Sequence, residues 1–154
     1  MMTVKESGAR AVADLNEKLV LASVEIAASP QRVFQALTSE EIVDWWVREG
    51  VFNTTEWRGD VRVGGSWRSA GLVNGEPYAL EGEYLVVDPP RKLVHTWRRV
   101  GAPGAETTVT YMLERLGEGT RLTLRHEGFA VPEACASVGS GWETSFARLA
   151  EILA

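Results

Sequence analysis

Two histidines, His95 and His126, have the side chains best suited to chemistry, because an imidazole can accept, donate or transfer a proton near neutral pH. Each falls on the apolar side of an alternating, strand-like segment. Folding the hairpins between them places the two rings two strands apart, roughly 10 Å from each other. That separation is too long for a shared metal ion or a direct hydrogen bond, but it would let the rings bracket a ligand.

Both histidines also have a purely structural interpretation, because a buried neutral imidazole needs a hydrogen-bond partner and can simply fill the core. For His95 the expected partners are Tyr84, Tyr111 or a buried water molecule. In a binding protein His95 would orient a polar group of the ligand. In an enzyme either histidine would act as general acid or base, with Tyr84 as a proton donor. The sequence leaves these alternatives open.

Aromatic residues are the second group of interest. The chain has 6 tryptophans in 154 residues, and indole rings both fill cores and line pockets for flat apolar ligands. Both roles are open for each ring. The predicted ligand-binding residues are Trp45, Trp46, Trp67, Tyr84, His95, Trp97, Tyr111, Trp142 and Phe146.

Motifs for covalent catalysis, metals and nucleotides are missing from the sequence. There is no Gly-x-Ser-x-Gly elbow. Cys135, the single cysteine, has no evident base and no metal-binding spacing. The pair Gly64-Gly65 precedes a strand and lacks the Lys and Ser or Thr of a phosphate loop. We therefore expect no metal, no cofactor and no catalytic residue, and a binding protein in preference to an enzyme.

Composition narrows the partners and the compartment. The net charge is −5, from 16 Lys plus Arg against 21 Asp plus Glu, with no basic block. Nucleic acid and anionic membrane surfaces are therefore poor partners. Residues 1–18 carry charges and no apolar run typical of a signal peptide or a membrane span. With its one cysteine, the chain is expected to be cytoplasmic.

The elements that position these residues follow from changes of hydrophobic period. Residues 19–27 alternate and predict a strand. Ser29 and Pro30 supply an N-cap and a first-turn proline for a short helix. Residues 38–41 have capping-box spacing for a second short helix that ends near Trp46. Further strands, separated by turn residues, are predicted at 54–58, 66–71, 78–87, 92–99, 107–116 and 120–128.

The end of the chain predicts one long helix. Its apolar residues, spaced by 4, 4, 3 and 4, are Val138, Trp142, Phe146, Leu149 and Leu153. Because this stripe must cover an apolar sheet face, we expect an α+β fold in which a curved antiparallel sheet of about six to seven strands wraps around the helix. Residues 1–18 are expected to form an N-terminal arm, frayed or briefly helical, and residues 19–154 the single ligand-binding domain.

Three turn-plus-strand segments carry a family resemblance: residues 59–67, 88–97 and 119–129. Ala-Leu-Thr-x-x-Glu at 36–41, the tandem Trp45-Trp46 and the pair Gly141-Trp142 add to it. Together they cover about residues 19–153. The chain resembles the START-like (SRPBCC, helix-grip) superfamily, in the branch named after the C-terminal domain of the heat-shock protein 90 ATPase activator.

The resemblance implies a cavity between the concave face of the sheet and the C-terminal helix. Across the superfamily such cavities hold lipids, hormones, polyketides and other apolar small molecules. The first hypothesis is therefore non-catalytic binding of a small apolar molecule, aromatic or cyclic, in that cavity. The second is a cyclase- or hydrolase-like enzyme that uses a cavity histidine. The third is a protein-interaction or chaperone-associated module, or a homodimer, that uses an exposed strand edge or the N-terminal arm.

Overall fold

The computed structural model describes residues 8–101 and 105–154, which form eight strands and three helices. In chain order the elements are β1 (Arg10–Asp14), β2 (Leu19–Ile26), α1 (Pro30–Leu37), α2 (Ile42–Trp45), β3 (Phe52–Gly59), β4 (Ser66–Val73), β5 (Glu76–Asp88), β6 (Lys92–Arg99), β7 (Thr107–Leu116), β8 (Gly119–Glu127) and α3 (Pro132–Leu153).

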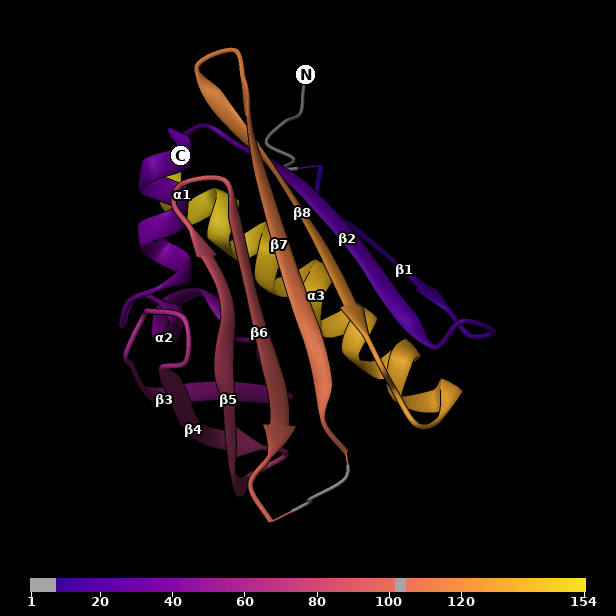
Figure 1. The fold of residues 1–154 in the computed structure, drawn as a ribbon. Coiled ribbons are helices and arrows are strands. Elements are labelled where there is room, and N and C mark those ends of the chain that lie inside the picture. Colours follow the sequence, from indigo (N-terminus) through magenta and orange to yellow (C-terminus); the bar gives the residue numbers. More distant parts are fainter. Residues whose placement is uncertain (1–7, 102–104) are drawn as a thin grey trace.

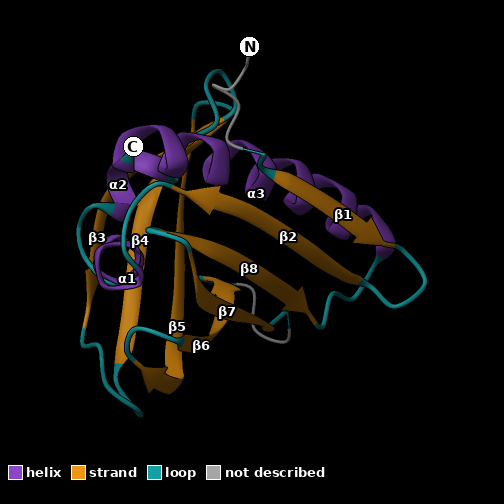
Figure 2. Ribbon diagram, turned by 90° about the horizontal axis from the view of Figure 1, so that it is seen from above, coloured by secondary structure: helices purple, strands orange, loops and turns teal. Residues whose placement is uncertain are grey.

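All of these strands join one antiparallel sheet, in the order β1-β2-β8-β7-β6-β5-β4-β3. The sheet curves, and α3 runs along its concave side, while α2 lies beside β3 and α1 lies near β7 and β8 (Figures 1 and 2). The predicted α+β helix-grip architecture is confirmed. The sheet has one strand more than the upper end of the prediction.

The additional strand is β1, which lies in the segment expected to be a frayed arm or a short helix. It pairs with β2 along its whole length and packs on α3. Ala11 donates its backbone N–H to Glu143 Oε1 of α3 at 3.1 Å. A Cβ built on Gly139 of α3 would lie 3.7 Å from the Cβ of Ala13, so small residues let helix and strand approach closely. A short, alanine-rich strand has a weak hydrophobic period, which is why the pattern missed it. Residues 1–7 of the predicted arm lie outside the described residues.

The first helix begins where the sequence predicted, and the second does not. Ser29 Oγ caps α1 by accepting from the backbone N–H of Arg32 at 3.2 Å. The capping box predicted for residues 38–41 is wrong, because α2 begins at Ile42 with no side-chain cap. Thr38 is instead the C-cap of α1, where its hydroxyl donates to the backbone carbonyl four residues earlier, at 2.8 Å. Thr38 therefore belongs to the end of α1, while α2 begins only after Glu41.

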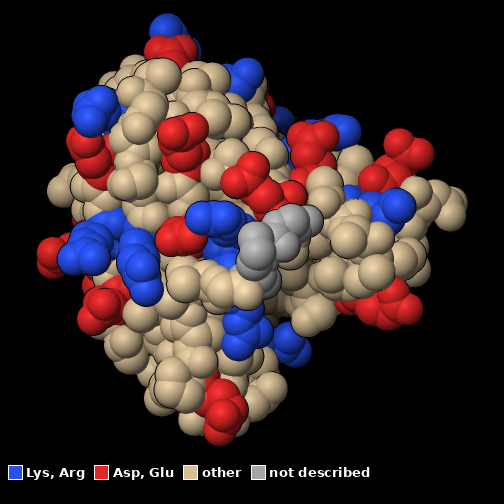
Figure 3. Space-filling model, turned by 60° about the horizontal axis from the view of Figure 1, so that its bottom comes forward, with Lys and Arg blue, Asp and Glu red and all other residues tan. Residues whose placement is uncertain are grey.

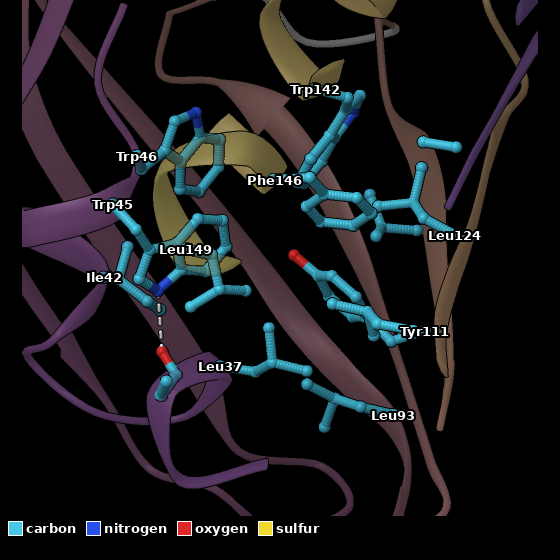
Figure 4. Packing of buried hydrophobic residues seen from close by; sticks show 14 of the residues in the cluster. Leu37, Ile42, Trp45, Trp46, Leu93, Tyr111, Leu124, Trp142, Phe146 and Leu149 are labelled. Carbon is cyan, nitrogen blue, oxygen red and sulfur yellow. Dashed lines mark hydrogen bonds between the residues drawn. The ribbon is translucent and has the colours of Figure 1, made fainter. Parts of the chain in front are cut away.

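The core forms where the apolar stripe of α3 meets the concave face of the sheet. Trp142, Phe146 and Leu149 are at most 2% exposed. In Figure 4 Trp142 and Phe146 lie beside Tyr111 and Leu124 of the sheet, whereas Leu149 lies beside Trp45. Full burial of each apolar side chain contributes about 1.5–3 kcal/mol relative to leaving it exposed. The stripe that the sequence predicted is therefore the main attachment of α3.

The inward face of the middle strands follows the predicted alternation. His95 lies opposite Val109, and Val109 lies opposite His126, so the two histidines share one row of the sheet, two strands apart. Both rings are buried, whereas Trp97 in the same strand as His95 is half-buried. A bulge in β5 shifts the register just after Tyr84 and leaves that side chain inside.

Candidate functional site

Trp46, which directly follows α2, brings tryptophans from several elements together. Its ring centroid lies 4.7 Å from that of Trp97 on β6 and 5.6 Å from that of Trp142 on α3. Trp45 and Trp67 complete the group at 6.2 and 6.5 Å. Aromatic pairs at such distances stabilise one another beyond the area that they bury. The sequence predicted the inward direction of the strand residues, but only the fold shows that they converge on Trp46.

A cavity of about 240 Å³ opens beside this group. It lies where β6 ends, β5 begins and the first half of α3 passes, at the lower end of the molecule in Figure 1. Trp46, Trp97 and Trp142 form one wall. The other lining residues are Arg48, Val51, Phe52, Val73, Tyr78, Leu80, Arg99, Ser137, Val138 and Gly141. The aromatic side chains therefore do not fill the whole interior.

The other residues of the predicted ligand-binding set pack in the core and do not line this cavity. Two of them use their indole N–H within the protein. Trp45 Nε1 donates to the carbonyl of Ala36 at 2.9 Å, and Trp67 Nε1 donates to the carbonyl of Thr96 at 3.1 Å. Ligand contact by these core residues stays a prediction; they are Trp45, Trp67, Tyr84, His95, Tyr111 and Phe146.

Four polar residues of the cavity were missed by the sequence analysis: Arg48, Tyr78, Arg99 and Ser137. The guanidinium carbon of Arg99 lies 5.9 Å from the centroid of the Tyr78 ring, within the range of a cation–π contact. A signal for Arg99 was present, since it shares the strand parity of His95 and Trp97. A basic residue at the end of a strand is ordinarily solvated, so the pattern alone gave it no role.

His126 is held in a closed chain of hydrogen bonds. Trp142 Nε1 donates to His126 Nδ1 at 3.0 Å. The neutral ring therefore carries its proton on Nε2, which donates to the Thr107 hydroxyl at 2.7 Å. Thr107 in turn donates to the carbonyl of Trp97 at 3.1 Å. Burial, with a smaller effect of the neighbouring His95, lowers the pKa of His126 to about 3. Both ring nitrogens are in use, so His126 has none left for a substrate.

His95 has a different partner from those that the sequence suggested. Its Nδ1 lies 2.9 Å from the carbonyl of Thr96 and must donate, because a carbonyl only accepts. The same carbonyl accepts from Trp67, while the backbone N–H of Glu83 bonds the Thr96 hydroxyl instead, at 2.9 Å. Burial lowers the pKa of His95 to about 4, so the ring is neutral at pH 7, with Nε2 as an acceptor.

Two tyrosines flank His95. The ring centroids of Tyr84 and Tyr111 each lie 5.9 Å from that of His95. Burial raises the pKa of both tyrosines, so their hydroxyls stay protonated at neutral pH. His95, which lies between two tyrosine hydroxyls that can donate protons, is therefore the one histidine left as a candidate acid or base. The enzyme hypothesis stays a prediction.

A second hollow, of about 780 Å³, lies on the outward side of β3 to β6. Its lining mixes basic and acidic side chains, among them Arg98 and Glu81, which form an ion pair at 2.6 Å. Such mixed and partly paired charges do not define one class of ligand. The hypotheses of an interaction module and of a homodimer also stay predictions.

The described residues contain no group of three or more His, Cys, Asp or Glu side chains arranged to hold a metal ion. In the same part of the chain, no helix has the length and the apolar character needed to span a membrane. Cys135 is buried in α3 and forms no disulfide.

Comparison with solved structures finds the same fold in several bacterial proteins. Protein CV1439 from Chromobacterium violaceum is 27% identical, over 88% of this chain and 96% of that chain, with a TM-score of 0.74. A Rhodobacter sphaeroides protein is 26% identical, over 88% and 91% of the two chains, with a TM-score of 0.73. Protein Ms6760 from Mycobacterium smegmatis, 21% identical over 94% and 95%, has a TM-score of 0.79 and shows likeness of fold alone. No curated protein matches the chain.

The family comparison covers the whole candidate site. The family model described as "Activator of Hsp90 ATPase homolog 1-like protein" matches residues 27–154, from just after β2 to the end of the chain. The matched part includes Trp46, both histidines and every residue that lines the 240 Å³ cavity. This agrees with the START-like resemblance of the sequence. The chain belongs to the family of Hsp90 ATPase activator homolog 1-like proteins.

Proposed function

We propose that the protein binds a small aromatic or cyclic molecule in the cavity beside Trp46 and does not change it chemically. The observation that carries this proposal is the wall of three indoles, Trp46, Trp97 and Trp142, on an open cavity of about 240 Å³. Pockets for drug-sized ligands usually measure about 300–1,000 Å³. The smaller volume favours a compact ligand with one or two rings.

The lining suits the apolar body of such a ligand. Apart from the tryptophans, Val51, Phe52, Val138 and Leu80 present hydrocarbon surface to the cavity. Burying apolar ligand surface there gains roughly 25 cal/mol per Å² before the costs of association. Offset or edge-to-face contacts with the indoles add about 0.5–1.5 kcal/mol each.

The proposal is tested by titration calorimetry with 2-naphthamide, a neutral two-ring probe, together with native mass spectrometry of freshly purified protein. We expect one molecule of 2-naphthamide bound per chain. The variant Val138→Trp should abolish binding, because the new indole would occupy the cavity from α3.

The matched control is Ala136→Trp, which adds the same side chain at an exposed position of α3 that does not line the cavity. This variant should bind 2-naphthamide as the unmodified protein does. Failure of the unmodified protein to bind the probe, or equal binding by Val138→Trp, would overturn the proposal.

A further inference from the structure

The mouth of the cavity carries two arginines with no carboxylate to balance them. Arg48 and Arg99 line it, and no Asp or Glu does. Within the described ranges 8–101 and 105–154, neither arginine forms an ion pair. Six other arginines do have a carboxylate partner there: Arg32, Arg62, Arg91, Arg98, Arg121 and Arg125.

Five other arginines also lack an ion pair among the described residues, so the missing pair alone does not set Arg48 and Arg99 apart. What distinguishes these two is that they line one cavity that has no acidic residue in its lining, in a chain with a net charge of −5. Figure 3 shows the lower end of the molecule, where Lys and Arg side chains lie among Asp and Glu side chains. Two unbalanced guanidinium groups at the rim of an apolar cavity form a local positive site.

Both arginines are held near the opening. The backbone N–H and carbonyl of Arg48 bond the carbonyl and N–H of Phe52 at 3.0 and 2.9 Å, which fixes its main chain. Its side chain is half-buried. Arg99 ends β6 and lies over the ring of Tyr78. Both arginines therefore line the cavity from ordered parts of the backbone.

We propose that the ligand of this cavity carries an anionic oxygen group, a carboxylate in the simplest case, which Arg48 and Arg99 bind at the mouth. This inference rests on the proposed function, since the aromatic body of the same ligand would contact Trp46, Trp97 and Trp142. The fork of an arginine donates two parallel N–H bonds to a carboxylate. The ligand class is therefore a compact aromatic or cyclic acid.

The test compares two probes of the same shape by titration calorimetry at pH 7.5: 2-naphthoate, which is anionic, and 2-naphthamide, which is neutral. We expect 2-naphthoate to bind at least about tenfold more tightly, which corresponds to about 1.4 kcal/mol. The preference should shrink as salt is raised, because the rim of the cavity is partly exposed and ions screen exposed charges.

Variants assign the preference to the two arginines. Arg48→Gln should weaken 2-naphthoate about tenfold. Arg99→Gln, at a more exposed position, should weaken it about two- to fivefold. The double variant should bind both probes equally, with the affinity for 2-naphthamide within about twofold of the starting value. Arg115→Gln, an equal charge change on the exposed side of β7, is the control and should change neither affinity.

The outcomes separate this inference from the proposed function. If both probes bind equally well, or if the double variant keeps the preference for 2-naphthoate, the anion inference is wrong and the aromatic cavity stands. If neither probe binds, the proposed function fails and this inference fails with it. Unchanged affinity for 2-naphthamide in the arginine variants shows that the cavity has stayed intact.

Discussion

The region around His126 and the mouth of the cavity lie next to each other and differ in whether their polar side chains have partners within the protein. Around His126 every hydrogen-bonding group is matched: Trp142 donates to the ring, the ring donates to Thr107, and Thr107 donates to the carbonyl of Trp97. At the mouth Arg48 and Arg99 have no carboxylate partner among the described residues.

The two regions share Trp97 and Trp142. Each contributes a polar group to the network of His126 and a ring surface to the cavity. The network therefore holds the indole of Trp142 and the backbone of Trp97 in place without a ligand, and preorganisation of this kind lowers the cost of binding. The comparison teaches that the matched polar groups support the wall of the cavity, whereas the two arginines that we propose to bind a ligand lie at its rim.

The largest expected effect is the loss of stability when an aromatic ring is removed from the core, compared with removal of a ring at the mouth of the cavity. Phe146 is fully buried, so Phe146→Ala should lower the unfolding free energy of the protein by about 3–5 kcal/mol. Phe52→Ala at the half-buried mouth should lose clearly less, because solvent already reaches part of that ring. Urea unfolding of both variants checks this. Equal losses would mean that the mouth is as tightly packed as the core.

The pH dependence of stability gives the next effect. Burial lowers the pKa of His95 to about 4 and that of His126 to about 3, both below the ordinary value of 6.5. Because the unfolded chain binds these protons first, stability should be constant above pH 6.5 and fall as pH drops from 6.5 toward 4, on the order of 3 kcal/mol per histidine.

Urea unfolding at a series of pH values measures this slope. His95→Gln should make it shallower by one proton, since the amide does not titrate. Arg48→Gln should keep the full slope, because it leaves both histidines in place. A variant without His95 that keeps the full slope would contradict the assignment.

A smaller loss of stability is expected when the hydrogen-bond network around His126 is broken. His126→Leu should cost about 1–3 kcal/mol, because the indole N–H of Trp142 loses its acceptor in a fully buried position. Combining it with Trp142→Phe removes the unpaired donor, so the double variant should lose less than the sum of the two single losses. Strict additivity in the unfolding free energies would show that the hydrogen bond has no energetic role.

The smallest effect is expected at the mouth. Arg48→Gln and Arg99→Gln should change the unfolding free energy by no more than about 0.5 kcal/mol, because neither side chain takes part in an ion pair among the described residues. Thermal unfolding without ligand checks this. A loss of several kcal/mol would make these arginines structural and would remove the contrast between the two regions.

Most of the sheet followed from period and turn chemistry. β6 and β7 have the predicted bounds, and the other strands after β2 differ from prediction by a few residues at their ends. The apolar stripe of α3 and the inward direction of His95 and Trp97 were equally readable, since both rest on strong local patterns. β1 was missed because its pattern is weak, and the cap of α2 was misassigned because Thr38 serves α1.

The candidate site was less predictable than the fold. Trp46, Trp97 and Trp142 were expected to bind a ligand and do line the cavity, but the same criterion selected Trp45 and Phe146, which fill the core. Composition and alternation show only that an aromatic side chain points into the interior of the protein. Whether it touches a neighbour or an open space depends on how far α2 and α3 stand from the sheet.

The sequence by itself determined that one antiparallel sheet would curve around a C-terminal helix and that two histidines and most of the tryptophans would face inward. Alternation and helical spacing are local properties, so neighbouring residues suffice to set them. Only the tertiary structure decided which polar groups found partners. The bonds of His126 join β6, β7, β8 and α3, while Arg48 and Arg99 line one cavity from segments about fifty residues apart along the chain. Such pairings depend on distances through space, which no local pattern contains.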